Sequence, residues 1–150
     1  MQIALSRGGV ELPFRGRMAL SVKVRLAAEI LFAYVRVHLL LRRSNVAETV
    51  KHLRNGETDP RPSAPSDLFT ATRLGRAVHR FLGHMPYDSQ CLVRSLVLTL
   101  LLERRGIPSR IVIGVRPGQR FMAHAWVEAG GVPMLPPGDA GKPFERVADL

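Results

Sequence analysis

The 150-residue sequence contains one cysteine, Cys91, so no disulfide can form within the chain. A lone thiol fits a reducing compartment, and it excludes any metal or redox site that needs several thiolates. Aromatic residues make up only 6% of the chain, too few to provide rings on which bases could stack. The sequence therefore lacks a nucleic-acid-binding motif as well as a disulfide framework.

Acidic residues are also scarce, since 12 Asp and Glu stand against 22 Lys and Arg, for a net charge of +10. The excess is mostly arginine dispersed along apolar stretches, which is typical of a solvated basic surface and would attract acidic partners. No apolar run approaches the roughly 20 residues of a membrane span, and no secretory signal is visible. We therefore expect a cytoplasmic protein with no membrane span and no nucleic-acid partner.

The chain divides at a proline-rich stretch, residues 57–65, which has the composition of a linker. It separates an N-terminal arm with helices, residues 1–65, from a core formed by residues 66–150. The content of hydrophobic residues, 46%, is that of a globular protein, and the length suits one ordinary domain. We expect the two parts to form one compact domain overall.

Three helices are predicted before the cysteine. Residues 18–43 show apolar side chains at three- and four-residue steps, which predicts a helix with that stripe facing the core; a membrane-surface helix is the alternative. Asn45 and Glu48 form a capping-box pattern for a second helix, and Ser66 or Asp67 is expected to cap a third. The stripe of the first helix consists of Leu20, Val24, Ala27, Ala28, Leu31, Val35 and Leu39.

A fourth helix, over about residues 92–102, is the clearest element. Its only polar side chains are those of Arg94, Ser95 and Thr99, and a helix that is apolar nearly all round is buried on most sides. Gly106 is placed to follow its C-cap. Strands are expected at 110–115, 121–127 and 132–135, with reversals at 117–118 and 130–131, and a last short element at 144–150.

Cys91 falls in the first turn of this helix if Asp88 or Ser89 is the cap. Free backbone N–H groups and the positive end of the helix dipole would favour the thiolate there, and the same N–H groups could stabilise an oxyanion. A lone cysteine on an apolar helix is more commonly a small core residue. Position alone leaves both interpretations open.

His124 is the candidate general base, because strand alternation places it on one face with Met122 and Trp126. A half-buried structural histidine is the alternative. Glu128 shares that face but lies about 13 Å along the strand, too far to orient the imidazole. We expect the orienting acid from beyond the 130–131 reversal, where Asp139 is the nearest carboxylate, with Glu145 and Asp149 behind it.

No metal site or cofactor is expected. Cys91 and His124 have no neighbours at zinc-ligand spacing, and no confident helix carries two histidines four residues apart.

Four ordered motifs resemble the lasso-peptide biosynthesis B2 proteins, leader peptidases with a transglutaminase-like core related in architecture to papain-type enzymes. The motifs are residues 91–96 (CLVRSL), 102–108 (LERRGIP), 112–115 (VIGV) and 124–128 (HAWVE). The resemblance covers about residues 74–135, half of the chain. It implies an α+β transglutaminase-like fold: N-terminal helices, a central buried helix with the cysteine, and a small antiparallel sheet with the histidine.

The resemblance also implies a Cys-His-Asp cysteine protease that removes the leader from a ribosomally made precursor peptide, with Cys91 as nucleophile and His124 as base. In that family a separate B1 protein binds the leader, and an ATP-dependent cyclase closes the ring; this chain would be the stand-alone protease. The family's aspartate tends to follow the glycine turn directly, where this chain has Leu135, Pro136 and Pro137, so either Asp139 acts from a shifted loop or the third member is missing. Acyl transfer to an amine and a non-catalytic peptide-binding scaffold remain the alternatives.

Overall fold

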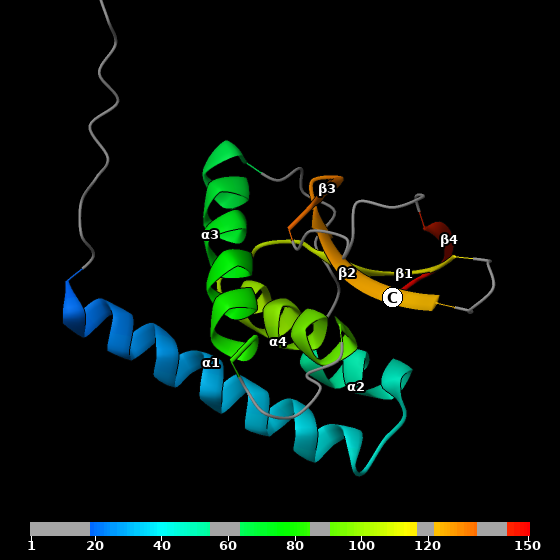
Figure 1. The fold of residues 1–150 in the computed structure, drawn as a ribbon, viewed down its shortest axis with the longest axis horizontal. Coiled ribbons are helices and arrows are strands. Elements are labelled where there is room, and N and C mark those ends of the chain that lie inside the picture. Colours follow the sequence, from blue (N-terminus) through cyan, green and yellow to red (C-terminus); the bar gives the residue numbers. More distant parts are fainter. Residues whose placement is uncertain (1–18, 55–63, 85–90, 117–121, 135–143) are drawn as a thin grey trace, which may run out of the picture.

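The computed structural model of the protein describes residues 19–54, 64–84, 91–116, 122–134 and 144–150. These residues form α1 (Leu20–Leu41), α2 (Val46–Leu53), α3 (Pro65–Leu82), α4 (Cys91–Glu103), β1 (Arg110–Arg116), β2 (Met122–Ala129), β3 (Val132–Pro133) and β4 (Glu145–Asp149). The strands make one antiparallel sheet in the order β3-β2-β1-β4. Helix α4 packs against β1 and β2, and it also contacts α1, α2 and α3 (Figure 1). The arrangement confirms the predicted α+β class.

Helix α4 forms the centre of the core. Every residue from Ser95 to Leu102 is buried, which explains why this stretch is apolar on all sides. The helix ends at Glu103, and Gly106 follows it in the predicted turn with a φ of 63°, the left-handed conformation that glycine adopts most easily. The N–H groups of Gly106 and Ile107 bond the carbonyls of Glu103 and Leu102 at 2.9 and 3.0 Å, which is a Schellman motif.

The start of α2 is confirmed, whereas the predicted start of α3 is wrong. Asn45 Oδ1 accepts from the Glu48 N–H at 2.9 Å, and Glu48 Oε2 accepts from the Asn45 N–H at 3.4 Å. The N-cap of helix α3 is Ala64, not Ser66 or Asp67, and Pro65 occupies the first helical position. Proline is favoured there since it needs no N–H partner, and the Asp67 carboxylate accepts from the Ala64 N–H.

The predicted inward face of α1 is also wrong. Ile30, Ala33 and Val37 are buried, whereas Leu20 and Val24 of the predicted stripe are 76% and 61% exposed. The helix carries two aliphatic stripes, and periodicity alone does not choose between them. The buried stripe has alanine where α1 meets the core, and a small side chain there allows the helices to approach closely. In the described part of the chain, no helix has the length and apolar character that a membrane crossing requires.

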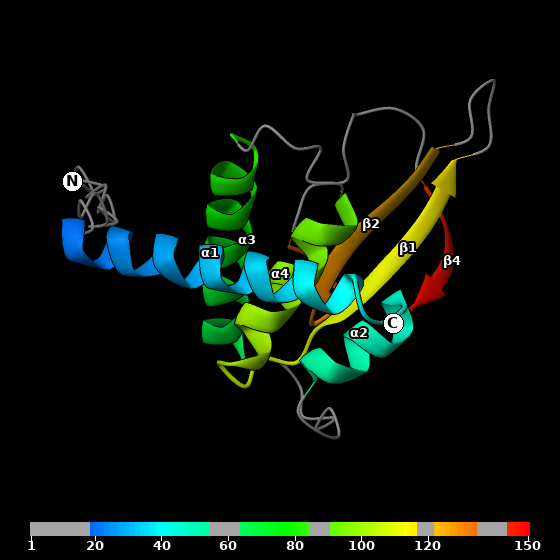
Figure 2. The same cartoon turned by 90° about the horizontal axis from the view of Figure 1, so that it is seen from below.

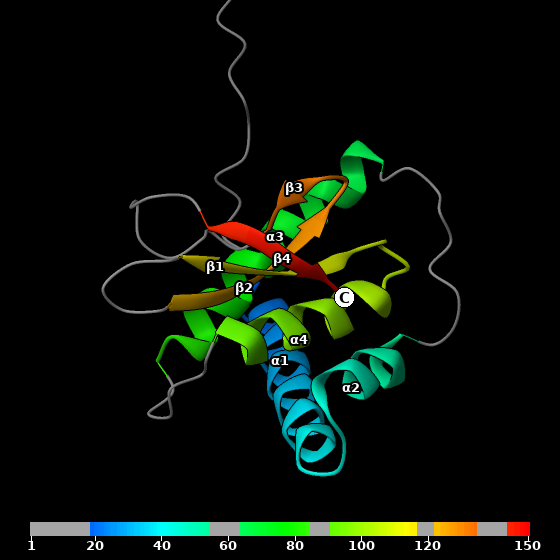
Figure 3. The same ribbon diagram turned by 90° about the vertical axis from the view of Figure 1, so that its right-hand side faces the viewer.

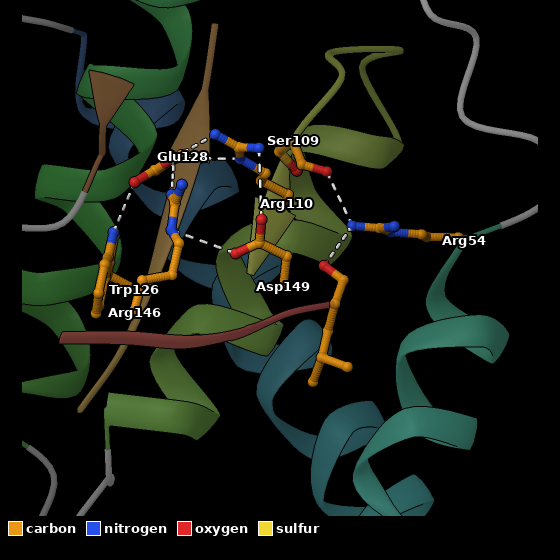
Figure 4. A network of polar contacts seen from close by, with 8 residues as sticks. Arg54, Ser109, Arg110, Trp126, Glu128, Arg146 and Asp149 are labelled. Atoms are coloured by element: carbon orange, nitrogen blue, oxygen red, sulfur yellow. Dashed lines mark hydrogen bonds and ion pairs between the residues drawn. The ribbon is translucent and has the colours of Figure 1, made fainter. Parts of the chain in front are cut away.

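The sheet joins the end of the chain to its middle. Strand β1 pairs with β2 on one side and with β4 on the other, and Gly130 and Gly131 make the predicted reversal with φ of 57° and 78°. Strand β4 is the expected last element, and Figure 3 shows it beside β1. Arg54, at the end of α2, donates from Nη2 to the carbonyls of Ser109 and Leu150, both at 2.9 Å (Figure 4).

The two faces of α1 supply a matched pair of variants. We expect V37A to lower the free energy of unfolding by about 2 kcal/mol, because it removes two buried methyl groups and leaves a cavity. V35A, on the same helix but 48% exposed, should change it by less than about 0.5 kcal/mol. Urea titrations followed by circular dichroism would measure both, and equal losses would contradict the observed burial.

Candidate active site

The structure brings the two candidate residues, Cys91 and His124, into contact. Cys91 is the first residue of α4 and is half-buried, and the His124 side chain on β2 forms a hydrogen bond with its thiol. The backbone N–H of Ala125 also donates to Cys91 Sγ, at 3.4 Å. The sulfur therefore lies against the strand that carries the imidazole. The expected caps, Asp88 and Ser89, fall outside the described residues.

These contacts favour the thiolate form of Cys91. The hydrogen bond with His124 lowers the pKa of the Cys91 thiol below its ordinary value, and the backbone N–H groups of Ala125 and Leu92 lower it further. Burial acts in the opposite direction, because it disfavours the charged form, but it does not prevail. A cysteine with a lowered pKa, partly exposed and beside a histidine, has the environment of a reactive thiol.

Both backbone groups of Ala125 are bonded to side chains of α4. Its N–H reaches Cys91, and its carbonyl accepts from Ser95 Oγ at 3.1 Å, one helical turn further along α4. Strand β3 pairs with β2 only at Glu128 and Ala129, so these groups lie on a stretch of β2 that β3 does not cover. Ser95 was visible in the sequence only as a small polar residue in an apolar helix, and its role was missed.

Two aromatic side chains lie beside the His124 ring. Its ring stacks on Trp126 with centroids 6.1 Å apart, and Phe144 lies tilted against it at 5.3 Å. Gly114 is the residue paired with His124 on β1, and a Cβ there would come within 2.9 Å of both Trp126 and Phe144. The absence of a Cβ at this position therefore leaves room for the Trp126 ring and for the Cβ of Phe144. The sequence contained Gly114 within the 112–115 motif and Phe144 at the start of the last element, but their place beside Trp126 and His124 was missed.

Glu128 is buried, and its hydrogen bonds lead to Trp126 and two arginines (Figure 4). The Trp126 indole donates to Oε1 at 3.0 Å, and Arg110 and Arg146 donate to Oε2 at 2.9 and 2.6 Å. Burial raises the pKa of Glu128, but the bonds from Trp126, Arg146 and Arg110 outweigh it and leave that pKa below its usual value. Glu128 thus holds Trp126 in place beside His124.

The other candidate acids are Asp149, Glu145 and Asp139, and the structure describes the first two of them. Asp149 forms ion pairs with Arg110 at 3.5 Å and Arg146 at 3.3 Å, and Glu145 is exposed on β4. Asp139 lies outside the described residues. Among the residues that are described, no group of three or more His, Cys, Asp or Glu could hold a metal ion.

The pH dependence of alkylation should report the Cys91 pKa. We expect iodoacetamide to modify wild-type protein with a midpoint below the ~8.5 of an ordinary cysteine, and H124N to move that midpoint upward because the hydrogen bond is lost. Mass spectrometry would follow the reaction at this single thiol. H79N, which alters an exposed histidine of α3, serves as the control, and equal midpoints in H124N and wild type would contradict the assignment.

Ser95 and Thr99 provide a second matched pair, since both are buried on α4. We expect S95A to lower the free energy of unfolding by about 1–3 kcal/mol, because it leaves the Ala125 carbonyl without its donor. Thr99 Oγ1 has no hydrogen-bond partner among the described residues, so T99V should be neutral or stabilising. S95A should also slow alkylation of Cys91 at neutral pH; an unchanged alkylation rate would refute a positioning role.

Comparisons with known proteins give a partial relative and a match to a family. The chain is 47% identical over 45 residues to the microcin J25-processing protein McjB of Escherichia coli; the match covers 30% of this chain and spans about a fifth, 21%, of that relative's length. No solved structure matches the chain. The sequence profile of the transglutaminase-like superfamily matches residues 31–148, which include all of the strands except the last residue of β4 and most of the helical residues. The protein therefore belongs to the transglutaminase-like superfamily.

Proposed function

We propose that the protein is a cysteine peptidase that removes the leader from a ribosomally synthesised lasso precursor peptide. The observation that carries the proposal is the hydrogen bond between the Cys91 thiol and His124 at the start of a buried helix. A nucleophile in contact with a base, at a helix N-terminus, is the arrangement that acyl-transfer chemistry on a thiol requires. Partial identity to a protein named for processing microcin J25 supports peptide processing as the reaction.

The mechanism follows from the placement of these two side chains. The Cys91 thiolate attacks the carbonyl carbon of the scissile peptide bond, and backbone N–H groups in the first turn of α4 stabilise the oxyanion. His124, which has taken the proton of the Cys91 thiol, donates that proton to the leaving amine as the C–N bond breaks. His124 then takes a proton from water, which attacks the thioester and releases the leader carboxylate and the free thiol.

Asp139 is our proposed third member, which would orient the His124 imidazole and stabilise its protonated form. The sequence supports this assignment, because Asp139 is the nearest carboxylate beyond the glycine reversal. Two rival acids of the described residues, Glu128 and Asp149, are already held by arginines.

The proposal also names partners and a compartment. The substrate is the leader region of the precursor peptide, a leader-binding B1 protein presents it, and the lasso cyclase acts on the released core. A reducing cytoplasm keeps the single cysteine as a thiol. The same thioester could instead pass to an amine, which would make the protein an acyltransferase of the same superfamily.

Precursor peptides encoded nearby, with and without a leader-binding protein, provide the test. We expect wild type to release the leader, C91A to release none, and H124A and D139N to turn over about 100-fold or more slowly, since they lose the base or its orientation. Liquid chromatography with mass spectrometry would identify the products.

Unchanged processing by C91A would eliminate the peptidase and leave a scaffold, whereas a product without a free leader carboxylate would identify an acyltransferase. Full turnover by D139N would assign the third role to another residue. H79A is the matched control for H124A, because the His79 side chain is exposed on α3.

A further inference from the structure

A groove with a volume of about 730 Å³ lies between α1 and α3. Leu26, Ile30 and Leu74 are among its apolar lining, and Ile30 and Leu74 belong to the buried core. Figures 1 and 2 show that the N-terminal turns of α1 extend beyond α3 instead of packing along it. The volume is that of a ligand pocket, and the floor is apolar.

The rim of the groove is strongly basic. Glu29 is the one acidic residue among the described residues that line it, and it is already paired with Arg25 at 3.4 Å and Arg105 at 2.6 Å. The hydrogen bond from Arg105 is the main reason why the pKa of Glu29 lies below its usual value, so its charge is retained and matched. The cations of the rim are Lys23, Arg25, Arg73, Arg76, Arg80 and Arg105, which leaves a net charge of +5 after Glu29 is subtracted.

We propose that this groove binds an acidic amphipathic segment of the polypeptide that Cys91 attacks, an inference that rests on the proposed peptidase function. Apolar side chains at helical spacing would enter the floor between α1 and α3, which is how an amphipathic helix occupies a hydrophobic groove. Carboxylates on either side would meet the arginine rim, where charge-assisted hydrogen bonds are strongest. The site is therefore an anchor for substrate, separate from the reacting bond.

Charge and shape disfavour two other occupants. Residues 1–18 of this chain contain three arginines and one glutamate, a net charge of +2, which the basic rim would repel. An anionic membrane is a broad surface, and it would meet the exposed outer stripe of α1 more easily than a hollow between two helices. An acidic peptide satisfies both the floor and the rim.

The groove and the thiol lie toward opposite ends of α4. Cys91 begins the helix, and Arg105, two residues beyond its end, lines the groove. Fourteen residue steps at the rise of an α-helix correspond to about 20 Å. An extended chain covers about 3.4 Å per residue, so at least about six residues should separate the acidic segment from the scissile bond.

The test compares two charge reversals of equal size in the full-length C91A protein, where no cleavage occurs. R76E/R80E alters two exposed arginines of the rim, one turn apart on α3, and R42E/R43E alters two exposed arginines outside the groove. The probe is a fluorescein-labelled synthetic peptide of about four helical turns, with leucines four residues apart and glutamates between them. Fluorescence anisotropy measures its Kd, and vesicles of phosphatidylserine form a parallel arm.

We expect R76E/R80E to raise the Kd about tenfold or more and R42E/R43E to raise it less than about threefold, because only the first pair meets the peptide. Equal effects of the two pairs, no binding of the peptide, or R76E/R80E affecting only vesicle binding would overturn the proposal. With the Cys91 protein and a precursor peptide, R76E/R80E should raise KM and leave kcat unchanged. Absence of any cleavage would count against the peptidase function, while the anisotropy comparison would still decide whether the groove binds acidic peptide.

Discussion

The candidate site depends on the backbone of Ala125, because its N–H and its carbonyl both form hydrogen bonds with side chains of α4. The N–H of Ala125 donates to Cys91 Sγ, and Ser95 Oγ donates to the carbonyl of Ala125. Two residues of α4 that are one turn apart therefore fix the position of the helix along β2. Because His124 precedes Ala125, the same bonds set the distance between imidazole and sulfur. Sliding the helix along the strand would break both bonds and leave a buried serine without its acceptor, which makes the thiol–imidazole pair a consequence of how α4 packs on the sheet.

The buried carboxylate of Glu128 stabilises the face of the sheet that carries His124. A buried charge is costly unless its oxygens accept hydrogen bonds. Glu128 receives hydrogen bonds from Trp126, Arg110 and Arg146, which belong to three different positions on β1, β2 and β4. Removing any one donor would leave a buried charge under-compensated. The network keeps Trp126 against the sheet, and Phe144, just before β4, completes the surroundings of the imidazole.

Helix α4 extends from the candidate nucleophile to the groove between α1 and α3. Its first residue is the thiol, and its far end reaches the arginine-rimmed groove between α1 and α3. The helix is buried from Ser95 to Leu102, so close packing on most sides holds it in place between the two sites. Part of the chain's excess of arginine therefore lines one groove instead of being spread evenly over the surface.

The sequence by itself determined the elements whose rules are satisfied within a few residues. The all-round apolar helix, the Asn45–Glu48 capping box, the turn at Gly106 and the reversal at Gly130 and Gly131 follow from local hydrogen bonding and backbone sterics. Cys91 and His124 could be proposed as partners, but their contact, and the part played by Ser95, required the packing of α4 on β2.

Tertiary structure also decided which stripe of α1 is buried. Both stripes are periodic and apolar, and only packing against the core, which buries Ile30, Ala33 and Val37, separates them. Local patterns specify what each segment can form, and complementarity of volume between distant segments specifies which face they share.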